Sequence, residues 1–229
     1  MAIFSGLILS IKRSQFRAND RGAAAADAEY RTARPRALES QGWRCYACRL
    51  VSKLTNEIHH LGRHDDNRPE QLKCACWLCH AYGHVGQAAV GPGGSDSSVE
   101  ALGRKTVMGY VPELSATDLN NLQRVLGLAL LDAGEKAMAE EIAKHLMARA
   151  KPVQESWGSY HPADFALCMA RLPEDMYEAR DEPLAGLRLI FNFGFLKDYA
   201  SRLLQERNWQ AMPVRTWATL AEGHLGDSQ

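Results

Sequence analysis

Two C-x-x-C pairs constrain the fold of this chain more than any other feature of its sequence. They are Cys45-Tyr-Ala-Cys48 and Cys76-Trp-Leu-Cys79. A C-x-x-C segment places two thiolates on one tight turn, and two such turns can close a tetrahedral site of four thiolates, the arrangement that structural zinc prefers. The sequence therefore predicts that both pairs bind one structural Zn²⁺ ion and tie two distant turns together.

The other two cysteines leave choices open. Cys74 lies two residues before Cys76, so this segment offers three thiols for two places. A C-x-x-C turn places two ligands on one ion better than C-x(4)-C, which favours Cys76 and Cys79 and leaves the role of Cys74 open. Cys168 stands alone in an apolar helical pattern and is expected in the core. A redox C-x-x-C is the alternative, but it requires a βαβ pattern that the sequence lacks.

The composition is that of an ordinary globular chain, with 229 residues of which 46% are hydrophobic and 24% charged. Such a composition excludes a disordered or low-complexity chain. No stretch reaches the ~20 apolar residues of a membrane helix, and the apolar start lacks the basic flank of a signal peptide. We therefore expect a cytoplasmic protein. The net charge is zero, but residues 1–80 carry 13 basic and 8 acidic residues, so the first part is basic and the rest acidic.

Histidines gather between the cysteine pairs and just beyond them. Five of the eight histidines lie here: His59, His60, His64, His80 and His84. The pair His80 and His84 is four residues apart, so both imidazoles project from one face of a helix and can reach the same metal ion. The segment Asn67-Arg-Pro-Glu-Gln-Leu72 separates the two histidine groups.

The order of these segments resembles the HNH, or ββα-metal, nuclease motif. In that family a C-x-x-C precedes a hairpin with one or two histidines, a loop Asn-Arg-Pro-Glu-Asn-Leu follows, and C-x-x-C-H opens a helix. The resemblance implies that His60 is a general base held by a loop asparagine, here Asn67, and that the enzyme cleaves DNA. The implied ligands of a second, divalent metal are His59, His80 and His84. One departure is Gln71, which stands where the family has asparagine.

The second half of the chain predicts helices. A strand is expected over 106–111, ended by Pro112, and Ser115-Ala-Thr-Asp118 is a capping-box variant that opens a helix. Pro183 suits a first helical turn, and apolar residues follow it at helical spacing. The helices are expected over 119–129, 137–147, 163–171 and 183–191, with a last helix or extension over 200–209, and the aromatic residues 191–209 form a helical core.

The whole arrangement resembles a narrower family. Its features are a leading strand and helix, the two C-x-x-C pairs, a Gly-rich segment, and the run Val111-Pro-Glu-Leu-Ser115 that continues into Asp118-Leu-Asn-Asn-Leu122. These resemble the DotN/IcmJ family of type IVB (Dot/Icm) secretion systems, over roughly residues 1–171. The resemblance implies a zinc knuckle used as a scaffold that binds the tail of the coupling ATPase, a DotL-like protein, and other coupling-complex subunits at the inner membrane.

We therefore expect an α+β fold: an HNH-like ββα zinc knuckle with a short N-terminal strand and helix, and a helical C-terminal half. The zinc-binding part is expected over residues 1–90, a Gly/Ser-rich loop over 91–104, a mainly helical region over 105–220 and a tail over 221–229. The favoured function is a zinc-scaffolded adaptor of a type IVB secretion or conjugation coupling complex that assists substrate recruitment. The alternative is a metal-dependent HNH endonuclease.

Overall fold

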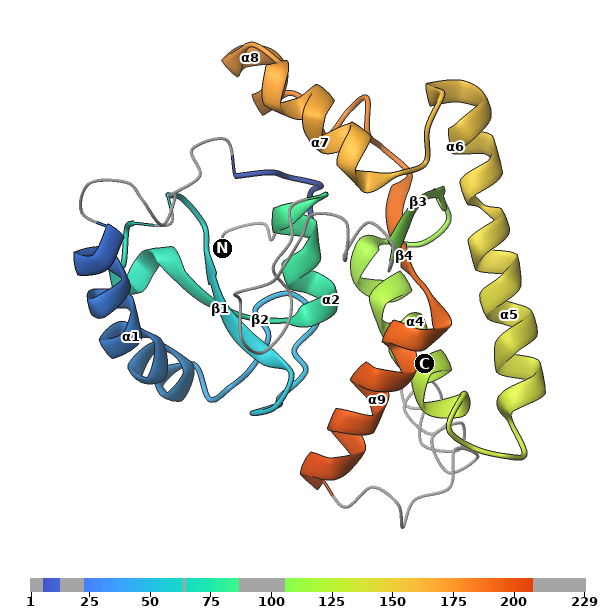
Figure 1. Cartoon of the computed structure of the whole chain (residues 1–229), viewed down its shortest axis with the longest axis horizontal. Coiled ribbons are helices and arrows are strands. Elements are labelled where there is room, and N and C mark those ends of the chain that lie inside the picture. Colours follow the sequence, from blue (N-terminus) through green and yellow to red (C-terminus); the bar gives the residue numbers. More distant parts are fainter. Residues whose placement is uncertain (1–5, 13–22, 64, 87–105, 208–229) are drawn as a thin grey trace, which may run out of the picture.

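The computed structural model describes residues 6–12, 23–63, 65–86 and 106–207, and Figure 1 shows how they are arranged. The fold is of the mixed α+β class, as expected, and contains two small antiparallel sheets of two strands each within these residues. The predicted Gly/Ser-rich loop over 91–104 and the predicted tail over 221–229 lie outside the described residues.

The first half is built on one hairpin. Its strands pair antiparallel, with Asn56 opposite Cys76 and His60 opposite Leu72. A helix begins directly after the second strand, so strand, strand and helix follow one another in space as in sequence. The elements are α1 (Ala23–Ser40), β1 (Asn56–His60), the 3-10 helix η1 (Pro69–Gln71), β2 (Leu72–Cys76), α2 (Trp77–His80) and the 3-10 helix η2 (Ala81–His84).

The predicted N-terminal strand is not formed over residues 6–12. This segment has no regular secondary structure and pairs with none of the strands in the described residues. The backbone N–H of Ser10 instead donates to the carbonyl of Tyr82 at 2.7 Å, and the N–H of Val85 donates to the carbonyl of Ser10 at 2.9 Å. The apolar side chains of Leu9 and Ile11 are buried. The segment lies along a helical turn rather than a sheet edge, so no ladder of hydrogen bonds can continue along it.

The second half contains one strand pair and six helices among the described residues. The predicted strand and the predicted start of the following helix are confirmed, and the Ser115 hydroxyl accepts a hydrogen bond from the backbone N–H of Asp118 at 3.1 Å. The elements are β3 (Thr106–Tyr110), α4 (Ala116–Ala129), α5 (Lys136–Ala148), α6 (Ala150–Trp157), α7 (Pro162–Arg171), α8 (Glu174–Glu178), β4 (Leu187–Phe191) and α9 (Phe193–Arg207).

The prediction of a helix through residues 187–191 is wrong. This segment is β4, which pairs antiparallel with β3 so that Met108 faces Leu189 and Thr106 faces Phe191. Four of its five side chains are buried, because the strand is covered on both faces. Such a short apolar run has no decisive periodicity, and a helix and a buried strand read alike in the sequence. The helices α6 and α8 were also not anticipated.

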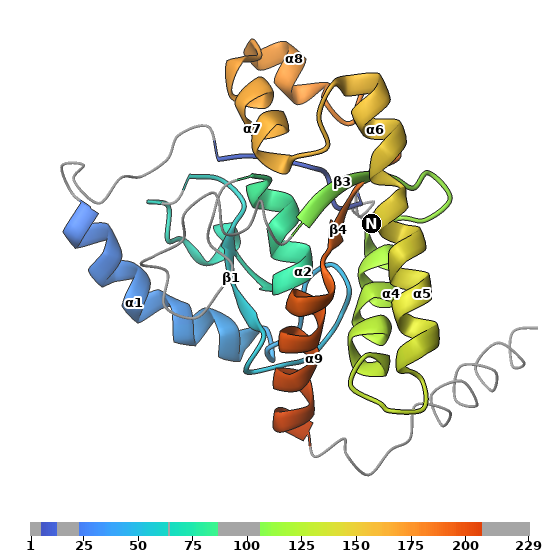
Figure 2. The same cartoon turned by 45° about the vertical axis from the view of Figure 1, so that its right-hand side comes forward.

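The two halves share one core, in which α4 and α9 lie side by side (Figure 2). Gly127 permits this close approach, because a Cβ there would lie 2.6 Å from the carbonyl oxygen of Leu196. The ring of Trp77, from the first half, contacts the ring of Tyr199 with centroids 6.0 Å apart. The helix α2 is thereby anchored against the helical half. Cys168 is not in this core: it is exposed, which corrects the prediction.

No helix in the described part of the chain is long and apolar enough to span a membrane. The longest is α1, with 18 residues, and it contains Pro35 and several charged side chains. The aromatic residues predicted to form a helical core are divided between elements. Phe195 and Tyr199 are buried on α9, Phe191 is buried on β4, and Trp209 lies outside the described residues.

Candidate metal centres

The two C-x-x-C pairs converge on one point. The Sγ atoms of Cys45, Cys48, Cys76 and Cys79 all lie within 4.8 Å of one another. Within this group the Sγ atoms of Cys48 and Cys76 are 3.5 Å apart. Four convergent thiol groups form the donor set that suits a structural zinc ion. The geometry is therefore compatible with one structural metal ion at this place.

The first pair sits on a tight turn after α1. The N–H of Cys45 donates to the carbonyl of Leu50 at 2.8 Å, and the N–H of Arg49 donates back to the carbonyl of Cys45 at 3.1 Å. Arg49 has a φ of 64°, a left-handed conformation that few non-glycine residues adopt and that reverses the chain. This reversal brings both thiols to the same side of the turn. The second pair spans the last residue of β2 and the helix α2.

Cys74 is not part of this cluster. It lies two residues before Cys76 on β2 and packs into a separate small core with Leu38, Ile58 and Leu72. Burial raises the pKa of the Cys74 thiol to about 12, so the group stays a neutral thiol. In contrast, hydrogen bonds from the Cys45, Cys76 and Cys79 thiols, with the charge of Arg124 adding to them, hold the pKa of Cys48 well below its usual range.

The helical half supplies donors to the cysteine cluster. Nη2 of Arg124 lies 3.1 Å from Sγ of Cys48 and 3.9 Å from Sγ of Cys76. Nδ2 of Asn120, one turn earlier on α4, lies 3.5 Å from Sγ of Cys79. Four thiolates carry more negative charge than one Zn²⁺ ion neutralises, so a cation and an amide donor beside them stabilise the site.

A second cluster contains the three histidines that the HNH resemblance implies as ligands. Ring nitrogens of His59, His80 and His84 lie within 4.8 Å of one another, and all three side chains are buried. His59 comes from β1, whereas the other two end the helical turns α2 and η2. Gly83 makes room for the cluster, because a Cβ at that position would overlap the ring of His59.

The donor set of this second cluster fits a divalent metal ion. The Nδ1 atom of His80 is buried and makes no hydrogen bond, and the carboxylate of Glu57 is the charged group next to it. Oε2 of Glu57 lies 3.6 Å from this nitrogen, and Oε1 of Glu57 accepts a hydrogen bond from Trp77 Nε1 at 3.1 Å. A carboxylate fixed next to a ligating imidazole is the usual arrangement around a metal-binding histidine.

His60 and Asn67 form a hydrogen-bonded pair beside this cluster. The distance from His60 Nε2 to Asn67 Oδ1 is 3.0 Å. Asn67 Nδ2 lies 3.5 Å from the carboxylate of Glu29, which orients the amide so that its oxygen faces the imidazole. An amide oxygen only accepts, so His60 donates through Nε2–H and Nδ1 is the basic nitrogen of the neutral ring. Burial, together with the charges of Lys12 and His80, lowers the pKa of His60 and favours that neutral ring.

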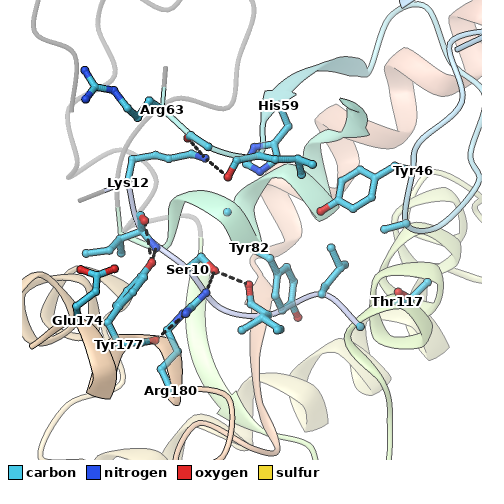
Figure 3. A pocket seen from close by; sticks show the side chains of 18 of the residues that line it. Ser10, Lys12, Tyr46, His59, Arg63, Tyr82, Thr117, Glu174, Tyr177 and Arg180 are labelled. Carbon is cyan, nitrogen blue, oxygen red and sulfur yellow. Dashed lines mark hydrogen bonds between the residues drawn. The ribbon is translucent and has the colours of Figure 1, made fainter. Parts of the chain in front are cut away.

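A cavity of about 860 Å³ opens beside His59 (Figure 3). Lys12 closes one side of it: its ammonium group donates to the backbone carbonyls of His60 and of Gly62, the latter at 3.0 Å. Lys12, Gly83, Asn120 and Arg124 were not among the candidates from the sequence, because nothing in their local patterns links them to the metal ligands. Gln71, at the asparagine position of the HNH motif, has its side-chain amide against Gly62.

Comparison with models of known protein families gives no match, and no curated protein is detectably similar in sequence. The inference of function therefore depends on the side chains that the fold brings together. These are the four cysteines, the three buried histidines, the pair His60–Asn67 and the lining of the adjacent cavity.

Proposed function

We propose that this chain is a metal-dependent nuclease built on an HNH-like ββα unit, with a structural Zn²⁺ ion at the four cysteines. The observation that carries the proposal is the pair His60–Asn67 next to the cluster of three histidines. An imidazole base held by a fixed amide, next to a second set of metal ligands, suits hydrolysis better than a purely structural role. The consecutive elements β1, β2 and α2 support the ββα assignment.

Each of these side chains would have a different role in phosphodiester hydrolysis. His60 would take a proton from the attacking water through Nδ1, and Asn67 fixes the ring that does so. The second metal ion would be held by His59, His80 and His84, and when bound it supplies positive charge to the scissile phosphate and the leaving oxygen. Glu57 orients His80, and the lowered pKa of His60 keeps the base unprotonated near neutral pH.

The nuclease proposal is tested with the purified, zinc-loaded chain. Supercoiled plasmid and single-stranded DNA are incubated with Mg²⁺, Mn²⁺, Ni²⁺ or Zn²⁺, and cleavage is followed on gels. We expect cleavage with at least one ion, and a loss of roughly 10²–10⁴-fold in rate for His60→Ala, the range that a general base contributes. His145→Ala is the matched control, because His145 is an exposed histidine of α5.

Intact DNA with all four ions would remove the proposal. Full activity of His60→Ala would remove His60 as the base. In both cases circular dichroism and zinc content establish that the variant is folded, so that a loss of activity is not a loss of structure.

A second function is supported by the helical half, because the ββα unit that carries the proposed nuclease site does not itself require it. We propose that this half acts as an adaptor in a type IVB secretion or conjugation coupling complex and binds the tail of the coupling ATPase, which would hold the protein at the inner membrane. Met138 and Ile142 are four residues apart on α5, so they share one face, and their exposed fractions are 57% and 37%. Such an exposed apolar pair suits the docking of a partner segment.

The adaptor proposal is tested by binding of the purified chain to the tail of the cognate coupling ATPase, measured by calorimetry. We expect a complex that the double variant Met138→Glu/Ile142→Glu weakens at least ~10-fold, the order of an interface hot spot. Lys144→Glu, an exposed change on the same helix, is the control. Absence of a complex with the unchanged chain would contradict this second function and leave the nuclease proposal untouched.

A further inference from the structure

The cavity beside His59 has fixed walls. Residues 6–12 form one wall, and α8 with the residues that follow it forms another (Figure 3). The hydroxyl of Tyr177 donates to the carbonyl of Ile11 at 2.9 Å and accepts from its N–H at 3.0 Å. The guanidinium of Arg180 donates to the carbonyl of Leu9 at 3.0 Å and to the Ser10 hydroxyl at 2.7 Å. The cavity is therefore held open without a ligand.

The lining of the cavity is cationic. It includes Lys12, Arg49, Arg63 and Arg180 but only one acidic residue, Glu174. Within the described residues, no acidic side chain pairs with the guanidinium of Arg49 or of Arg180. Arg63 is paired with the exposed Asp65 at 2.8 Å, an ion pair that solvent weakens. Positive charge around a concave site attracts a polyanion.

An aromatic ring stands at the same cavity next to the histidine cluster. Tyr46 lines the cavity, and its ring lies nearly parallel to that of His59, with an interplanar angle of 10° and centroids 6.4 Å apart. Tyrosine rings beside basic side chains are the platforms on which single-stranded nucleic acids stack their bases. In a duplex the bases are already paired and stacked, so such a ring offers a duplex no comparable contact.

We infer that the cavity binds a short stretch of single-stranded nucleic acid, with phosphates at Arg49 and Arg63 and one base against Tyr46. The inference deepens the nuclease proposal and rests on it, because the bound strand would present its backbone to His59. Burial favours a single strand further: His59, the histidine that lines the cavity, is only 6% exposed. A backbone must bend into the cavity to reach it, and a single strand bends more readily than a stiff duplex.

Binding is measured separately from cleavage. The zinc-loaded chain, without any other divalent ion, is titrated into a fluorescein-labelled 12-mer of thymidine or into the same strand annealed to its complement, and anisotropy is recorded. We expect the single strand to bind at least ~10-fold more tightly than the duplex. Arg49→Ala should weaken binding and reduce the slope of log affinity against log salt by ~0.7, the share of one phosphate contact on a single strand.

Two further variants examine the stacking contact. Tyr46→Ala should weaken single-strand binding about fivefold or more, and Tyr46→Phe, which keeps the ring, should restore it. Arg36→Ala is the matched control for charge, because Arg36 is exposed on α1 and does not line the cavity. The control should leave the affinity within the error of the measurement.

The outcomes separate this inference from the nuclease proposal. Duplex bound as tightly as the single strand, or affinities unchanged in both Arg49→Ala and Tyr46→Ala, would overturn the inference even if the chain cleaves DNA. Single-strand binding that depends on Arg49 and Tyr46 supports the inference, and it does so even if no metal ion yields cleavage. In that last case the nuclease proposal fails alone.

Discussion

The guanidinium of Arg124 lies 3.1 Å from Sγ of Cys48, although the two residues are 76 positions apart in the chain. Arg124 belongs to α4, in the helical half, and Cys48 belongs to the turn that opens the cysteine cluster. The helical half therefore completes the surroundings of the cluster and does not merely follow it in sequence. Asn120 adds a second donor from the same helix, toward Cys79.

Replacing Arg124 is expected to weaken zinc binding. Arg124→Met removes the charge and the donors but keeps much of the side-chain volume, and zinc affinity should fall ~10–100-fold, the usual cost of losing a group that supports a metal ligand. Arg124→Lys, which keeps the charge, should lose less. The affinity is measured by competition with a chromophoric chelator. Equal affinities for the unchanged chain and for Arg124→Met would show that the contact contributes nothing to metal binding.

Three single substitutions distinguish a zinc-binding cysteine from a buried and from an exposed one. Cys45→Ser should abolish stoichiometric zinc binding and unfold the first half, because structural zinc contributes an apparent ~10–16 kcal/mol to folding. Cys74→Ala should keep the zinc and lose only about 1–2 kcal/mol of stability, since it removes one small buried group. Cys168→Ser, at an exposed position, is the control. Zinc content by elemental analysis and urea unfolding measure both effects, and loss of zinc from Cys74→Ala would contradict the assignment.

Gly83→Ala is expected to disable the histidine cluster selectively. The added Cβ would overlap the ring of His59, so His59 must leave its place beside His80 and His84. Binding of Co²⁺ or Ni²⁺ to zinc-loaded protein, followed by calorimetry, should be lost while the zinc at the cysteines remains. Gly6→Ala is the control, because it lines the same cavity and its Cβ would meet nothing within 4 Å. Undiminished Co²⁺ binding by Gly83→Ala would exclude His59 as a ligand.

The buried position of Lys12 predicts that the free energy of unfolding depends on pH. Burial lowers its pKa from 10.5 to about 8 in the folded chain. Between these values the unfolded chain binds more protons than the folded chain, so the unfolding free energy rises with pH. The difference in this free energy between the unchanged chain and Lys12→Met should therefore shift in favour of the unchanged chain from pH 7 to pH 10. Urea unfolding at both pH values measures this difference in free energy. Lys144→Met is the control for the general effect of losing one lysine charge. The same difference between the unchanged chain and Lys12→Met at pH 7 and pH 10 would contradict the prediction.

The sequence predicted the parts of the site that depend on residues close together in the chain. The C-x-x-C turns and the four-residue step from His80 to His84 place their side chains together through local geometry alone. The choice of Cys76 and Cys79 over Cys74 agrees with the arrangement of the thiols, because Cys74 packs with Ile58 and Leu72 and takes no part in the group of four. The pairing of His60 with Asn67 required the family resemblance, because a loop separates them.

What the sequence missed depends on contacts between distant segments. Arg124 reaches the cysteine cluster and Lys12 reaches the backbone of His60 from distant segments of the chain, and no local pattern marks either residue. The strand β4 was predicted as helix because its five apolar-rich residues fit both the helical and the strand periodicity. Only the pairing with β3 shows which of the two forms. Cys168 was placed in the core because its neighbours are apolar, yet it falls on the outer face of α7.

The proposed function requires that this fold hold two different metal ions, one structural and one catalytic. Anomalous scattering from crystals of the zinc-loaded chain soaked in Mn²⁺, with data recorded on either side of the zinc edge, places each ion directly. We predict a zinc peak surrounded by Cys45, Cys48, Cys76 and Cys79 and a separate manganese peak at His59, His80 and His84. A map with no zinc among the sulfur atoms, or with no second ion at the imidazoles, would contradict the account.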